Sequence, residues 1–127
     1  MAPTFEEEHQ AILRDLEAGI MQVYETHPEI VDHNVDKVMD LLIRSFEADV
    51  KGKRQPVVKL NTDEKLIYQR LLNTCEFWMN QREAGLPTYT KETVILCLKR
   101  IHKSMHSWTR KNGMRGYLDF VKAFING

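Results

Sequence analysis

The apolar residues of this chain recur three and four positions apart over four long segments. The pattern covers residues 5–25, 33–50, 62–84 and 91–111, and a shorter version covers 114–125. This spacing places the apolar side chains on one face of an α-helix and leaves the polar side chains on the other. The pattern therefore predicts four amphipathic helices and a short fifth one.

Capping residues support these boundaries. Thr4 and Asn61 each precede a predicted helix and are followed three positions later by a glutamate, as in a capping box. Asp32 and Thr90 are the expected caps of the second and fourth helices. The stretch KGKRQPVV at 51–58 contains a glycine and a proline, and three of its first four residues are bases. It is therefore expected to be a loop, with an extended piece at its two valines.

Four amphipathic helices joined by short connections indicate an all-α fold. The 127 residues suffice for one domain, which we expect to span residues 1–127. The helices are predicted to form an antiparallel four-helix bundle that the short C-terminal helix closes.

The third predicted helix is apolar over an unusually wide arc. An arc of this width either contacts several neighbouring helices or leaves some apolar surface uncovered. Tyr68, Trp78 and Met79 are the candidate interface residues if the arc is partly exposed, and core residues if it is not. An exposed arc would favour self-association as a dimer.

The charges divide the chain into two halves, although the net charge is zero. Residues 1–49 hold twelve acids and three bases, and residues 50–127 hold fifteen bases and six acids, so the halves carry −9 and +9. Acidic and basic helices of this kind can pair within one chain or across a dimer contact, where they fix partner choice and register. The leading functional hypothesis is therefore a non-catalytic interaction or assembly module, with a second copy or another protein as its partner.

The bases of the fourth helix gather opposite its apolar stripe, where they could bind a partner or an anion. They are Lys99, Arg100, Lys103, Arg110 and Lys111, and Arg115 follows them. Binding of nucleic acid or another polyanion is the second functional hypothesis. An isoelectric point near 7.0 and the expected burial of Trp108 and Tyr117 argue against it.

Two histidines on the fourth helix could share a metal ion, because His102 and His106 are four residues apart on one helix. Position 103 is a lysine where the HExxH motif has its glutamate. We therefore expect no metal site, and these two histidines are the candidates if one exists.

Arg100 and His106 also spell R-x5-H, which resembles the R-x4-6-H signature of HEPN-type helical ribonucleases. The resemblance covers seven residues and implies a ribonuclease that carries its motif on a late helix of a small, often dimeric bundle. Ile101 stands where that family usually has a polar residue. An enzyme, either such a ribonuclease or a metal-dependent hydrolase, is the third hypothesis, and no catalytic residue is assigned.

Other features of the sequence argue against a membrane-spanning or secreted protein. No apolar run approaches the ~20 residues that a membrane span needs, and the first ten residues lack the features of a secretory signal. Cys75 and Cys97 lie in helical patterns without a CxxC motif, so reduced, buried thiols are expected. These features predict a cytoplasmic protein without a cofactor.

Overall fold

The computed structural model describes residues 2–83, 85 and 88–126, and all regular structure in them is helical. The elements are α1 (Phe5–Glu8), α2 (Gln10–Thr26), α3 (Asp32–Lys51), α4 (Thr62–Met79) and α5 (Lys91–Asn126). The predicted all-α class is confirmed. None of the described helices is long and apolar enough to cross a membrane.

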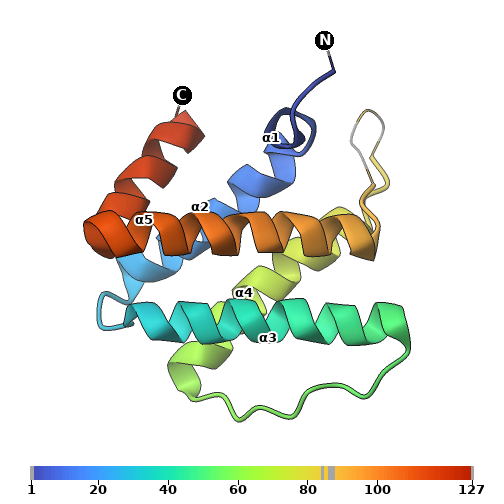
Figure 1. Ribbon diagram of the computed structural model, residues 1–127, viewed down its shortest axis with the longest axis horizontal. Coiled ribbons are helices and arrows are strands. Elements are labelled where there is room, and N and C mark those ends of the chain that lie inside the picture. The colour runs from blue at the N-terminus through green and yellow to red at the C-terminus, as the bar shows by residue number, and fades with distance from the viewer. Residues whose placement is uncertain (1, 84, 86–87, 127) are drawn as a thin grey trace.

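The helices pack in two crossing layers. α3 and the first part of α5 lie side by side and run in opposite directions, with α2 and α4 behind them (Figure 1). α2 packs on α4 and α5, and α3 packs on the same two helices. Between the layers lies one continuous apolar core. Its most deeply buried side chains include Ile12, Leu16, Ile20, Val38, Met39, Leu42, Ile67, Leu71, Leu98 and Ile101.

Three of the four predicted caps are present. Thr4 Oγ1 accepts the backbone N–H of Glu7 at 3.2 Å, and Thr90 Oγ1 accepts that of Thr93 at 3.2 Å. The Asn61–Glu64 capping box is reciprocal. Asp32 is not a cap, because α3 begins one residue earlier than predicted and Val31 occupies the cap position.

Other predicted boundaries differ from the structure. The first predicted helix is interrupted at His9, whose backbone leaves helical geometry with φ −116° and ψ 19°, so α1 and α2 are separate. The predicted third helix ends at Met79 rather than at 84, and Gly85 lies outside it. The stretch after α3 is a loop, as predicted, and Val57 in it is 95% exposed.

Glu64 joins α3 to α4. Its carboxylate accepts hydrogen bonds from the backbone of Asn61 at 2.9 Å, from Asn34 Nδ2 at 3.1 Å and from Lys37 Nζ at 3.0 Å. The Asn61 bond, with the Lys37 and Asn34 bonds, outweighs burial and lowers the pKa of Glu64. This carboxylate is therefore buried in its charged form, with at least one hydrogen bond to each oxygen.

α5 bends at Gly113, where φ is 70° and ψ is 178°. The bend separates the predicted fourth and fifth helices and turns the last segment back over the bundle (Figure 1). Across the bend the rings of Trp108 and Phe120 stack with centroids 4.8 Å apart. Tyr117 is fully buried, as predicted, but Trp108 is 36% exposed, because its ring packs on the returning segment instead of entering the core.

The positive φ of Gly113 predicts a stability loss for Gly113→Ala. Almost only glycine adopts this combination of φ and ψ, and a side chain there costs on the order of 1–3 kcal/mol. Gly19→Ala is the matched control, since Gly19 lies inside α2 and an added Cβ would only contact Arg70 at 3.6 Å. Urea unfolding followed by circular dichroism is expected to show a lower midpoint for Gly113→Ala and an equal or higher one for Gly19→Ala. Equal midpoints for Gly113→Ala and the wild type would contradict the bend geometry.

Glu17 makes stability depend on pH. It is 6% exposed, its Oε2 has no hydrogen-bond partner in the described residues, and burial raises its pKa to about 7. Because the folded pKa exceeds the unfolded one, near 4.5, its favourable contribution is complete below pH 4.5 and is lost as pH rises through 7.

Glu17→Gln is therefore expected to raise the free energy of unfolding at pH 8, relative to the wild type, by on the order of 2–3 kcal/mol more than at pH 4.5. Denaturant unfolding of both proteins at the two pH values measures this difference. A difference that does not change with pH would show that Glu17 titrates normally in the folded protein.

Candidate functional site

Three polar side chains converge between α3 and α5. Asp36 Oδ1 contacts the Nε2 atoms of both His102, at 2.7 Å, and His106. The two imidazole rings lie edge to face with centroids 4.5 Å apart. One carboxylate oxygen of α3 thus contacts two histidines of α5. We call Asp36, His102 and His106 the Asp–His cluster.

Helical spacing explains how the cluster forms. His102 and His106 are one turn apart on α5 and border the buried Ile101 and Met105. Asp36 likewise follows the buried Val35 on α3. Because the apolar stripes of both helices face the core, the residues that border them meet at the edge of the helix–helix contact.

The cluster is partly open to solvent. The side chains of His102, Asp36 and His106 are 21%, 45% and 50% exposed. Partial burial alone would raise the pKa of Asp36, but the hydrogen bonds from the two histidines outweigh it and lower that pKa. Asp36 is therefore a carboxylate at neutral pH, with donors or cations beside it.

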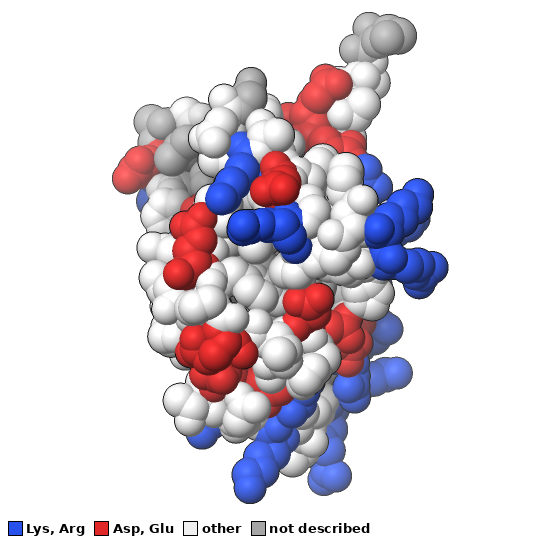
Figure 2. Space-filling model, turned by 90° about the vertical axis from the view of Figure 1, so that its left-hand side faces the viewer, with Lys and Arg blue, Asp and Glu red and all other residues white. Residues whose placement is uncertain are grey.

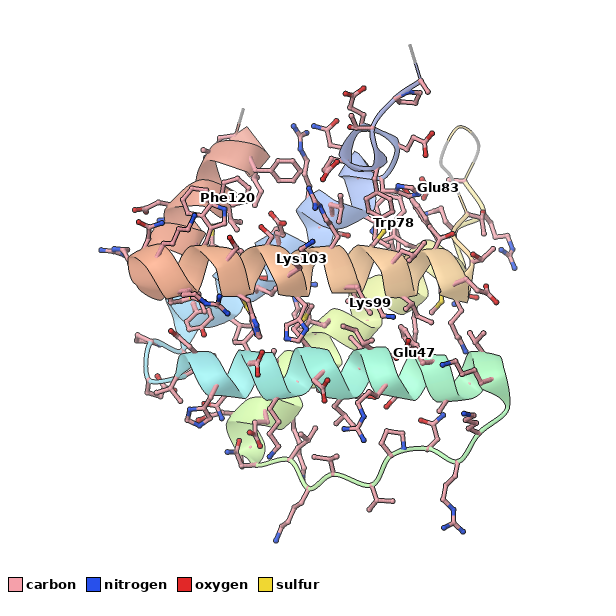
Figure 3. All side chains as sticks on the ribbon, viewed as in Figure 1. Glu47, Trp78, Glu83, Lys99, Lys103 and Phe120 are labelled. Atoms are coloured by element: carbon pink, nitrogen blue, oxygen red, sulfur yellow. The ribbon has the colours of Figure 1, made fainter. Side chains whose placement is uncertain are left out.

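Several bases of α5 pair with acids of the first half of the chain. Lys99 Nζ lies 2.8 Å from Glu47 Oε2, and Lys91 Nζ lies 3.2 Å from Asp49 Oδ2. Lys99 and Glu47 point toward one another between the two helices (Figure 3). Opposite charges of the two halves therefore meet within one chain.

Two further pairs connect α5 to the N-terminal helices. Arg100 contacts Glu6 of α1, and Lys122 Nζ lies 3.7 Å from Glu25 Oε1 of α2. Figure 2 shows the end of the molecule where α5 bends. Acidic and basic side chains lie side by side near its upper centre, whereas basic side chains predominate along its right-hand and lower edges.

Other bases of α5 remain unpaired. Lys103, Arg110 and Lys111 form no ion pair within the part of the chain that the structure describes. Together with His106 and Ser107 they line one depression of about 340 Å³. Counted with His106 and Ser107, these side chains recur three and four residues apart, which places all five on one face of α5. We call Lys103, Arg110 and Lys111 the cationic stripe, and His106 belongs to both this depression and the Asp–His cluster.

The structure thus divides the predicted basic surface. Lys99 and Arg100 are exposed but paired, the cationic stripe is unpaired, and Arg115 lies beyond the bend, where it lines a different depression with Asp32 and Leu118. Lys51 at the end of α3 and the loop bases Lys53 and Arg54 line their own depression of about 240 Å³ with Arg44 and Glu47.

The candidate interface residues of α4 are largely covered. Trp78 is 7% exposed, and its Nε1 donates to Asp15 Oδ2 at 2.9 Å. Tyr68 and Met79 are half-buried against the core. The exposed large apolar side chains of this helix are instead Leu66 and Phe77.

The R-x5-H pair points in two directions. Arg100 contacts α1 through Glu6, whereas His106 contacts α3 through Asp36. The structure therefore does not bring these two side chains to one point.

Sequence reasoning missed Asp36 and Ser107. Asp36 is 66 and 70 residues from the histidines that it contacts, and helical periodicity does not show which of the twelve acids of the first half faces them. Ser107 could have been found, since it lies four residues from both Lys103 and Lys111 on the same face.

Comparison of this chain with models of known protein families, with curated proteins and with solved structures found no match.

Proposed function

We propose that the protein binds the phosphate backbone of a nucleic acid through the cationic stripe of α5. The observation that supports this proposal is the pairing pattern: Lys91, Lys99 and Arg100 are neutralised by acids of the same chain, and the three bases of the stripe are not. A base whose role is to neutralise an acid of the same chain would lie close to that acid. Unpaired bases around one depression leave a positive potential that attracts anions.

The neighbouring groups suit phosphate oxygens. Ser107 adds a hydroxyl donor to the depression, and His106 adds a ring nitrogen. Arg110 can donate two parallel hydrogen bonds to one phosphate, and the two lysines act as point charges.

The antiparallel four-helix bundle expected from the sequence stays a prediction for this all-helical scaffold, on which α5 presents the stripe on an exposed face. The cytoplasmic location expected from the sequence agrees with a nucleic-acid ligand and remains a prediction.

Neutralising the stripe tests the proposal. Lys103→Gln, Arg110→Gln and Lys111→Gln, combined in one variant, are expected to weaken binding of a fluorescein-labelled DNA duplex at least about tenfold at 50 mM salt. The slope of log Kd against log salt should fall by about 2–3, because each lost phosphate contact removes about 0.9 from it. Fluorescence anisotropy over a series of salt concentrations measures both quantities.

The matched control carries the same charge change elsewhere. Lys51→Gln, Lys53→Gln and Arg54→Gln remove three charges from the other basic depression. This variant should keep most of the wild-type affinity and slope. Equal losses in both variants would mean that only net charge matters, and no binding by the wild type at 50 mM salt would reject the proposal. A labelled RNA duplex and single strand show which nucleic acid is preferred.

Assembly through complementary charge is the second candidate function. The exposed Leu66, Phe77 and Leu96 favour it, since they are 41%, 52% and 54% exposed and could be covered by a second copy or another protein.

Light-scattering mass after size exclusion, at low and at high salt, tests the role of charge in assembly. We expect the mass to be the same at both salts, because four acids of the first half, Glu6, Glu25, Glu47 and Asp49, are paired with bases of α5 in the same chain. A dimer at low salt that dissociates as salt rises would instead show that the charges act between chains.

A further inference from the structure

We propose that Asp36, His102 and His106 together bind one divalent transition-metal ion of the class that includes Zn²⁺, at the contact between α3 and α5. This proposal goes beyond phosphate binding and does not depend on it. It rests on the convergence of two imidazole nitrogens and one carboxylate oxygen.

The geometry fits a single ion. The three ligand atoms, one from each side chain, all lie within 4.8 Å of one another. Around a tetrahedral zinc ion with bonds of 2.0–2.1 Å, ligand atoms lie about 3.3 Å apart. Small rotations of partly exposed side chains are enough to move from hydrogen bonds between the ligands to bonds with an ion placed among them.

The donor set selects the class of metal. Neutral imidazole nitrogen is a good ligand for zinc, nickel, copper and iron, whereas magnesium and calcium prefer oxygen alone. The two histidines come from successive turns of one helix and the carboxylate from another, so a bound ion would link α3 to α5. Three protein ligands leave a fourth position for water or another small ligand.

The surroundings allow an ion to enter from solvent and favour an anionic fourth ligand. The side chains of Asp36 and His106 are 45% and 50% exposed, so an ion can enter from solvent. His106 also borders the depression lined by Lys103 and Arg110. These cations would disfavour an additional cation, but they would stabilise an anionic fourth ligand on a bound ion.

Calorimetric titration with zinc chloride tests the proposal, on the full untagged chain after removal of bound metal with a chelator. The wild type is expected to bind one equivalent of Zn²⁺, and Mg²⁺ is expected not to bind. His102→Ala, His106→Ala and Asp36→Asn should each weaken zinc binding at least about tenfold, a loss that even outer-shell substitutions can cause. Replacing zinc with Co²⁺ should give visible absorption bands in the wild type that the variants lack.

His27→Ala is the matched control. His27 lies outside the cluster, and its Nδ1 is 3.4 Å from an acid, Glu29, so it resembles the cluster histidines without their geometry. This variant should bind zinc as the wild type does. A wild type that binds no more tightly than Asp36→Asn, or a control that loses as much affinity as His106→Ala, would overturn the proposal.

Thermal unfolding provides a second readout that separates ligand loss from misfolding. Zinc should raise the Tm of the wild type and of His27→Ala, because an ion that binds only the folded chain stabilises it. The cluster variants should show wild-type circular dichroism and a Tm that zinc raises clearly less than in the wild type. Folded cluster variants whose Tm still rises with zinc as in the wild type would reject the site.

Discussion

The contact between α3 and α5 positions the Asp–His cluster and two of the ion pairs that join the halves of the chain. Both helices bury an apolar stripe, with Val38 and Leu42 on one and Leu98 and Ile101 on the other. Burial of these stripes fixes the rotation of each helix about its own axis. The polar residues that border the stripes are then brought to the edge of the contact, where the Asp–His cluster and the ion pairs form.

The order of the polar partners agrees with two helices that run in opposite directions. Asp36 pairs with His102 and His106, and further along α3 Glu47 pairs with Lys99. Positions on α5 therefore decrease as positions on α3 increase. Exposed ion pairs contribute roughly 0–1 kcal/mol each, whereas each fully buried Leu or Ile side chain contributes about 1.5–3 kcal/mol. The apolar stripes stabilise the contact, and the charges mainly select its register.

Local features of the fold were readable from the sequence, because they depend on residues close together in the chain. The helical periodicity and the Asn61–Glu64 capping box are features of this kind. The position of the bend at Gly113 was also predictable, because the fourth predicted helix ends at an Asn-Gly pair. The break at His9 could not be predicted from the sequence. Thr4 caps a single helical turn, and nothing in the local pattern marks where that turn ends. Trp108 follows the apolar spacing, yet it packs on Phe120 across the bend.

The candidate site was less predictable, because it depends on contacts between distant residues. The sequence indicated a basic helix and a histidine pair, but not which bases would be neutralised or which acid would meet the histidines. Both answers depend on the packing of α5 against α3, which is a tertiary property. Asp36 became a candidate only when that packing was known.

Zero-length carbodiimide crosslinking tests the pairing of the two halves most directly. This reagent joins a carboxylate to an amine only where the two are in contact, so Glu47 with Lys99 and Asp49 with Lys91 are the expected links. In a mixture of ¹⁴N- and ¹⁵N-labelled chains, mass spectrometry of the linked peptides distinguishes links within a chain from links between chains. Contact within one chain predicts only pairs with a single isotope. Linked peptides that combine the two isotopes would place the acidic and basic halves in different chains and contradict the account.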